Sequence, residues 1–120
     1  ARNIAWGIVT NKPSQYTDAI IQQLNLQHRC RVAICPDQVQ NKKPHPEPIL
    51  KACKEIGVDP LNTFYVGDHI RDIESGRAAG AQTIAALWGY IPKDEDTKAW
   101  GADYYVTHPE QLTNFFSRYW

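Results

Sequence analysis

Five polar residues in this chain have types and spacings that could bind and transfer a phosphoryl group. Asp68 and Asp72 lie four residues apart, so both carboxylates would face one side of a loop and first helical turn, where their like charges repel unless a cation lies between them. Mg²⁺ is the natural cation, because it prefers carboxylate oxygens. Thr10, Asn11 and Lys43 could supply the hydroxyl, backbone N–H groups and ammonium that phosphoryl oxygens require. One site would use all five.

These residues also have ordinary structural interpretations. Asp68 could cap the helix that follows it, while Asp72 forms a surface ion pair with Arg71 or Arg77. Lys43 lies in a proline-rich loop, where a lysine is usually solvated, and a threonine that follows a strand commonly forms a turn. Spacing alone leaves both interpretations open.

Short apolar runs alternate with helical patterns along the chain. The runs rich in β-branched or aromatic residues predict strands at residues 4–9, 32–35, 63–66, 82–87 and 104–106. Apolar residues at helical spacing predict helices at residues 14–24, 46–56, 73–79 and 109–119. Ser14 is the expected N-cap of the first helix, and Gly57 and Gly80 are expected to end the second and third.

This alternation predicts an α/β fold: a Rossmann-like, doubly wound, mostly parallel sheet with helices on both faces. Ligands of such sheets bind beyond the carboxyl ends of the strands. Thr10 and Asn11 follow the first predicted strand, and Asp68 follows the third. Lys43 follows the second on an extended segment, because each proline there disfavours helical geometry in the residue before it. The strand ends are therefore the places where a site is expected.

The composition is that of one ordinary globular domain. Of 120 residues, 42% are apolar and 22% charged, and 13 basic residues balance 13 acidic ones. This balance argues against binding to nucleic acid or to an anionic membrane, and no stretch approaches the roughly 20 apolar residues of a membrane helix. We expect a cytoplasmic protein in which Cys30, Cys35 and Cys53 are buried free thiols.

Three segments occur in an order that is specific to one family. IVTNKP (residues 8–13), KKPHPEP (42–48) and YVGDHIRDIESGRAAGA (65–81) resemble motifs II, III and IV of the haloacid dehalogenase superfamily, whose members are mostly magnesium-dependent phosphatases. The GDxxxDxxxGxxAG pattern within the third segment is the most specific. The resemblance covers nearly the whole chain, and it implies that residues 1–120 are the C-terminal part of a phosphatase core domain.

The resemblance also implies a role for each candidate residue. Thr10 would hydrogen-bond the transferring phosphoryl group, and the backbone of Asn11 would face the same group. Lys43 would neutralise charge on the nucleophile and the phosphoryl group. Asp68 would help to bind Mg²⁺, and Asp72 would support the metal through water or fix its neighbours. The expected partner is a small phosphorylated metabolite.

The family's motif I, an Asp-x-Asp-Gly-Thr sequence that carries the nucleophilic aspartate, has no counterpart in the chain. The nearest string, DEDT at residues 94–97, lacks the glycine and a preceding apolar strand, and we interpret it as a surface loop. In the family, the motif I strand lies between the strands of motifs II and IV, and the cap domain is commonly inserted just after it. We therefore expect an unfilled slot in the sheet. The missing N-terminal segment of the same protein is a second expected partner, and these residues alone are expected to be inactive.

Two other classes of protein share parts of this pattern. A phospho-acceptor receiver module is also doubly wound, with clustered aspartates and a lysine, but its acceptor aspartate precedes the threonine, and no aspartate precedes Thr10. A non-catalytic remnant that binds metal or phosphate without turnover is the other alternative. We interpret Trp6, Trp88, Trp100 and Trp120 as packing or edge aromatics that imply no cofactor.

Overall fold

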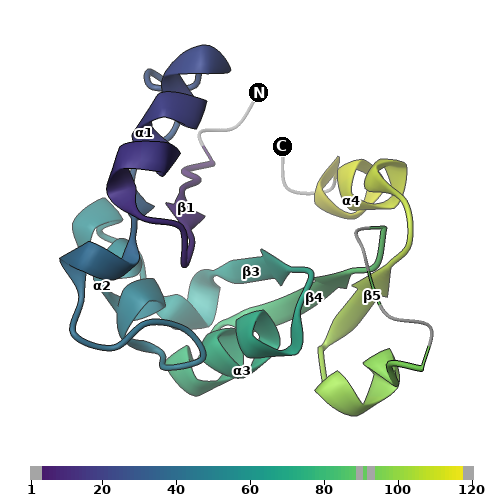
Figure 1. Cartoon of the computed structure of the whole chain (residues 1–120). Helices are drawn as coiled ribbons and strands as arrows, with labels where there is room; N and C mark the ends of the chain where they lie inside the picture. The colour runs from purple at the N-terminus through teal and green to yellow at the C-terminus, as the bar shows by residue number, and fades with distance from the viewer. Residues whose placement is uncertain (1–3, 89–90, 92–93, 118–120) are drawn as a thin grey trace.

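The structure, a computed structural model, describes residues 4–88, 91 and 94–117. Strands and helices alternate along it (Figure 1). The strands are β1 (Ile8–Val9), β2 (Ala33–Ile34), β3 (Phe64–Gly67), β4 (Gln82–Ala86) and β5 (Tyr104–Val106). The helices are α1 (Ser14–Gln23), α2 (Glu47–Ile56), α3 (Ile70–Ala79) and α4 (Pro109–Phe116). This order confirms the predicted α/β fold class.

Every described strand pair is parallel, but the strands form two sheets. β1 pairs with β2 through the registers Ile8↔Ala33 and Val9↔Ile34, and β3, β4 and β5 form a second sheet in that order. Within the described residues, no strand pairing joins β1 to β3. The sheets therefore separate between the strands of motifs II and IV, where the family resemblance leads us to expect an unfilled slot.

The first strand is shorter than the apolar run that predicts it. β1 covers two residues rather than residues 4–9. The N–H groups of Ile8 and Thr10 donate to carbonyls of the β2 segment at 2.9 and 3.1 Å, so β2 stabilises one edge of this short segment. The start of the run is partly open to solvent, with Ile4 46% and Trp6 39% exposed. Pairing on one side supports a strand only where β2 runs alongside.

The ends of α2 and α3 are set by glycines, as predicted. Gly57 has φ 85° and Gly80 has φ 90°, in the left-handed region that side-chain-bearing residues rarely adopt. The start of α3 at Ile70 lies three residues before its predicted start. His69 caps this helix, because its Nδ1 accepts a hydrogen bond from the Arg71 N–H at 3.2 Å. Asp68 is therefore not the N-cap.

Of the other two helices, α1 differs slightly from expectation at its start, and α4 agrees with expectation at its start. α1 begins with Ser14 as a helical residue rather than as its N-cap, and the Ser14 N–H donates to Asp37 Oδ1 at 3.1 Å. α4 confirms the helix predicted from Pro109, as far as Phe116. The predicted end of this helix at Tyr119 lies outside the described residues.

The core lies on both faces of β4, because helices cover both sides of the second sheet. On one face Ala85 packs with Ile73 of α3 and with Trp100. On the other face Ile84 and Ala86 pack with Val106 of β5, and side chains of α4 cover them. A parallel strand covered on both faces has a nearly continuous apolar sequence, which explains why the run at residues 82–87 predicted β4 well.

Two expectations about composition can be compared with the described residues. The three cysteines are free, but only Cys35 and Cys53 are buried, while Cys30 is partly exposed. None of the described helices has both the length and the apolar character that crossing a membrane requires.

Candidate active site

Lys43 lies at the centre of a hydrogen-bond cluster between the two sheets. The loop before α2 carries it, and the residue is only 8% exposed. Its Nζ donates to Asp72 Oδ1 at 2.6 Å, to the Tyr65 hydroxyl at 3.0 Å and to Val9 O at 3.1 Å. An ammonium group has three N–H donors, so each has an acceptor here. The interpretation of Lys43 as a solvated loop lysine is therefore wrong.

Asp72 uses both carboxylate oxygens to hold its surroundings. Oδ1 pairs with Lys43, and Oδ2 accepts the backbone N–H groups of Asp68 and His69 at 3.1 and 3.2 Å. The surface ion pair with Arg71 or Arg77 is not formed, because Asp72 is buried against Lys43. These contacts suit the supporting role that the family resemblance implies, in which Asp72 fixes its neighbours.

Asp68 presents an exposed carboxylate to the same site. It lines a cavity of about 280 Å³ together with Lys43, Asp72, Tyr65 and Trp88. No described residue donates a hydrogen bond to its side chain, so its oxygens are available to a ligand.

The carboxylates present fit a magnesium ion only as part of a larger ligand set. Among the described residues, no group of three or more His, Cys, Asp or Glu side chains could hold a metal ion. Mg²⁺ is, however, usually bound through one or two carboxylates together with waters and phosphate oxygens. Asp68 provides one such carboxylate, and Asp72 accepts a hydrogen bond from the Asp68 backbone N–H.

Thr10 and Asn11 lie beside the cavity, but they are not among the residues that line it. The Thr10 hydroxyl accepts the Lys12 N–H at 3.1 Å, which is an ordinary turn contact. The Asn11 side-chain amide donates to the Lys43 carbonyl at 3.3 Å and thereby connects the first strand end to the lysine loop. The structure thus gathers Lys43, Asp68 and Asp72 around one cavity and places the other two residues next to it.

Sequence reasoning missed Tyr65, which is central to the cluster. Its hydroxyl donates to Val9 O at 3.0 Å and accepts from Lys43. Burial and then the negative charges of Asp72 and Asp68 raise the pKa of Tyr65 well above its ordinary value, so the hydroxyl keeps its proton. The alternation of side chains along a strand could have indicated Tyr65. It lies two residues before Gly67, so both residues are on the same face of β3, next to Asp68.

The acidic string at residues 94–97 does not contribute to the cavity. Residues 94–96 are exposed, which confirms the surface-loop interpretation, and Glu95 accepts the Trp100 indole N–H at 3.1 Å.

Trp100 is buried at 4% exposure and packs in the core as expected. Trp88 is 43% exposed, which suits its interpretation as an edge aromatic, and it lines the cavity. Trp120 lies outside the described residues.

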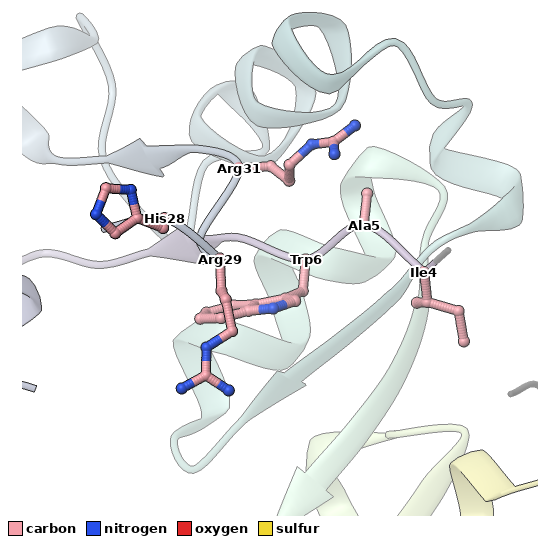
Figure 2. A pocket seen from close by; sticks show the side chains of 6 residues that line it. All are labelled: Ile4, Ala5, Trp6, His28, Arg29 and Arg31. Carbon is pink, nitrogen blue, oxygen red and sulfur yellow. The ribbon is translucent and has the colours of Figure 1, made fainter. Parts of the chain in front are cut away.

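A second cleft lies before β1 and β2, at the end of the strands opposite to Thr10. Its volume is about 450 Å³, and its lining consists of Ile4, Ala5, Trp6, His28, Arg29 and Arg31. Figure 2 shows Arg29 alongside the Trp6 ring, with the guanidinium groups of Arg29 and Arg31 on opposite sides of this segment. The two cations do not converge on one position, so this cleft is not a candidate anion site.

Comparison with known families agrees with the geometry around Lys43. A family model described as haloacid dehalogenase-like hydrolase matches residues 1–86. The chain belongs to the haloacid dehalogenase-like hydrolase family. The matched range contains the strand end at Thr10, the buried Lys43 and both aspartates of the cavity. The resemblance of the three sequence segments is thereby confirmed.

Curated haloacid dehalogenase-like relatives are similar to almost all of this chain. An N-acetylmuramic acid 6-phosphate phosphatase of Pseudomonas putida is 50% identical over 110 residues, which are 92% of this chain and 49% of that protein. A phosphoglycolate phosphatase of Xanthomonas campestris is 50% identical over 107 residues, which are 89% of this chain and 48% of that protein. The chain therefore spans about half the length of the curated relatives it matches.

Solved structures of the family share the fold. A haloacid dehalogenase superfamily hydrolase from Ehrlichia chaffeensis superposes with a TM-score of 0.81 at 27% identity, covering 97% of this chain and 51% of that one. This likeness confirms the α/β Rossmann-like architecture.

Proposed function

We propose that this chain contributes the C-terminal half of a Mg²⁺-dependent phosphomonoester hydrolase that works through an aspartyl-phosphate intermediate. The observation that carries the proposal is the cavity in which the buried Lys43–Asp72 ion pair adjoins the exposed carboxylate of Asp68. A cation stabilises the oxygens of a transferring phosphoryl group, and a free carboxylate beside it suits a divalent ion. The phosphatase names of the curated relatives support the same reaction class.

In this proposal the chain supplies the groups that bind and neutralise the phosphoryl group. Lys43 offsets negative charge on the phosphoryl oxygens and on the nucleophile, and Thr10 and the backbone of Asn11 donate hydrogen bonds to the same group. Asp68 would hold Mg²⁺, while Asp72 keeps Lys43 and the Asp68 loop in position. When bound, the ion neutralises charge on the phosphoryl group.

The nucleophile comes from a strand outside this chain, in the N-terminal part of the same protein. We place that strand between β1 and β3, because the sheets separate there. The N–H groups of Ile8 and Thr10 point toward β2, so the carbonyl of Val9 between them faces the open edge, where it accepts side-chain donors. The incoming aspartate would attack phosphorus and break the ester P–O bond, so that the substrate leaves as the alcohol; water would then hydrolyse the aspartyl-phosphate to inorganic phosphate and free aspartate.

The proposed substrate is N-acetylmuramic acid 6-phosphate, which would assign the enzyme to bacterial cell-wall recycling. Phosphoglycolate is the alternative. Relatives with each name are 50% identical to the chain, so identity over this half does not separate the two. Substrate choice in the family depends largely on the cap domain.

The test is Mg²⁺-dependent phosphate release from N-acetylmuramic acid 6-phosphate and from phosphoglycolate, measured in parallel on this chain and on the full-length protein. We expect activity in the full-length protein alone, with the faster substrate identifying the enzyme. Activity in the isolated chain would mean that the nucleophile lies within these 120 residues and that its assignment to an N-terminal strand is wrong. No activity in either sample would refute the hydrolase proposal.

A non-catalytic module is the second candidate, and one observation favours it for these residues taken alone. All three N–H donors of Lys43 already have protein acceptors, so none is free for a phosphoryl oxygen. A full-length protein without an Asp-x-Asp-Gly-Thr segment would favour this candidate over the hydrolase.

A further inference from the structure

Tyr65 is the acceptor of Lys43 that can be changed without altering charge or backbone. Of the three acceptors, Asp72 carries the compensating charge, and Val9 contributes only its main-chain carbonyl. The Tyr65 hydroxyl, 3.0 Å from Nζ, is neutral. The lysine ammonium is a compact charge at the end of a flexible stem, so its direction depends on the acceptors around it.

The Tyr65 ring is held firmly enough to direct another side chain. Its backbone lies in β3, where Tyr65 is registered with Thr83 of β4. On the α3 side, Gly76 approaches the ring so closely that an added Cβ would lie 3.4 Å from Tyr65 Cδ2. The single hydroxyl proton is donated to Val9 O at 3.0 Å, which leaves the oxygen lone pairs to accept from Lys43. The hydroxyl therefore has one defined orientation.

The proposed strand between β1 and β3 changes which acceptors remain. A parallel strand pairs through backbone N–H groups, and Val9 O is a carbonyl that faces this edge. Val9 O has two lone pairs, which accept from Lys43 and from Tyr65. When a backbone N–H occupies one of them and the Tyr65 hydroxyl keeps the other, the corresponding N–H of Lys43 is released. Asp72 and Tyr65 then hold the ammonium at two points, and its third N–H is free to reach the cavity that Lys43 lines.

We propose that Tyr65 is a positioning residue for Lys43, which it holds together with Asp72 so that one N–H of the ammonium faces the phosphoryl group. This inference rests on the proposed function. Tyr65 touches no reacting atom, and its effect passes through Lys43. Loss of the hydroxyl leaves the ammonium held at one point, by Asp72, and its free N–H is then poorly directed. Small misplacements of a catalytic group lower the rate of the chemical step more than substrate binding.

The first arm of the test uses Tyr65→Phe in the full-length protein, which removes only the hydroxyl. We expect kcat to fall roughly tenfold to a hundredfold, the effect of one lost hydrogen bond to a charged group, with KM changed by less than about twofold. Tyr16→Phe is the matched control, because Tyr16 is 56% exposed on α1, and it should leave both constants unchanged. An unchanged kcat in an active Tyr65→Phe protein would overturn the proposal.

The second arm does not depend on turnover. In the same proteins, the ¹⁵N-resolved ammonium signal of Lys43 reports how fast its N–H protons exchange with water. We expect a slowly exchanging signal in the parent and in Tyr16→Phe, and faster exchange in Tyr65→Phe. Unaltered exchange in Tyr65→Phe would overturn the positioning role even if kcat falls. If the full-length protein hydrolyses neither phosphomonoester, the hydrolase proposal fails, and the exchange rates alone decide whether Tyr65 positions Lys43.

Discussion

Asp72 and Lys43 form a buried ion pair across 29 residues of sequence, with 2.6 Å between Oδ1 and Nζ. Each side chain is 8% exposed. The pair joins the loop before α2 to the first turn of α3, and the second oxygen of Asp72 also holds the backbone of Asp68. The contact that positions the proposed catalytic cation is therefore also one that holds the fold together.

Breaking this pair should destabilise the protein. In Asp72→Asn the buried charge of Lys43 loses its compensation, and we expect the free energy of unfolding to fall by about 3–5 kcal/mol. Urea denaturation of the variant and the parent measures this loss. Asp68→Asn is the matched control: Asp68 is exposed, so its stability should change by less than about 0.5 kcal/mol. Equal losses in both variants would contradict the assignment of distinct roles.

Asp68→Asn, the control for stability, should strongly lower metal-dependent turnover. In the full-length protein, we expect Asp68→Asn to lower kcat by about 10²-fold or more, because a charge that stabilises the transition state through the metal site is lost. The Mg²⁺ concentration that gives half-maximal rate should rise. Asp94→Asn changes an exposed acid outside the cavity and should leave both quantities unaltered. Near-normal turnover in Asp68→Asn would rule out its role as a metal ligand.

Gly76 allows α3 to lie close to the second sheet. An added Cβ would lie 2.7 Å from Thr83 Cγ2, closer than packed carbon atoms tolerate. We expect Gly76→Ala to lower the free energy of unfolding by about 1–3 kcal/mol through overpacking. Glu74→Ala, an exposed change on the same helix, serves as the control in thermal or urea unfolding. A more stable Gly76→Ala protein would show that the helix can move away without cost.

Glu47 should make stability depend on pH. Its carboxylate accepts the backbone N–H groups of Gln40 and Asn41, each at 3.0 Å, and the Gln40 bond is the main cause that lowers the pKa of Glu47 below its ordinary 4.5. Because the pKa of Glu47 is lowered in the folded state, the ionised carboxylate contributes to the free energy of unfolding. This contribution is fully present above pH 4.5 and is lost as the pH falls through the pKa of Glu47 in the folded protein.

The corresponding measurement compares Glu47→Gln with the parent in urea denaturation between about pH 3 and 7. We expect the parent to be more stable at the upper end and the two proteins to converge at the lower end. Glu55→Gln, at an exposed position of the same helix, should show no such convergence. A stability difference that grows as the pH falls would reverse the predicted sign.

Much of the local structure could be predicted because its causes lie within a few residues. Gly57 and Gly80 end helices through their own backbone freedom, and the apolar run of β4 reflects burial on both faces. The prediction was less accurate at residues 4–9, where strand length depends on a partner strand rather than on the run itself. Strand propensity indicates where a strand can form, and pairing decides how far it extends.

The sequence by itself determined the α/β fold class, the family and the types of residue at the strand ends, because these follow from periodicity and from motifs with specific spacing. Only the tertiary structure decided that Asp72 pairs with Lys43 instead of a neighbouring arginine, and that Tyr65 joins them. These contacts connect residues 22 and 29 positions apart, and no local pattern encodes which buried cation meets which buried acceptor. The physical reason is desolvation: a lysine enclosed between two sheets must find acceptors for its charge and all its protons, and packing determines which ones are within reach.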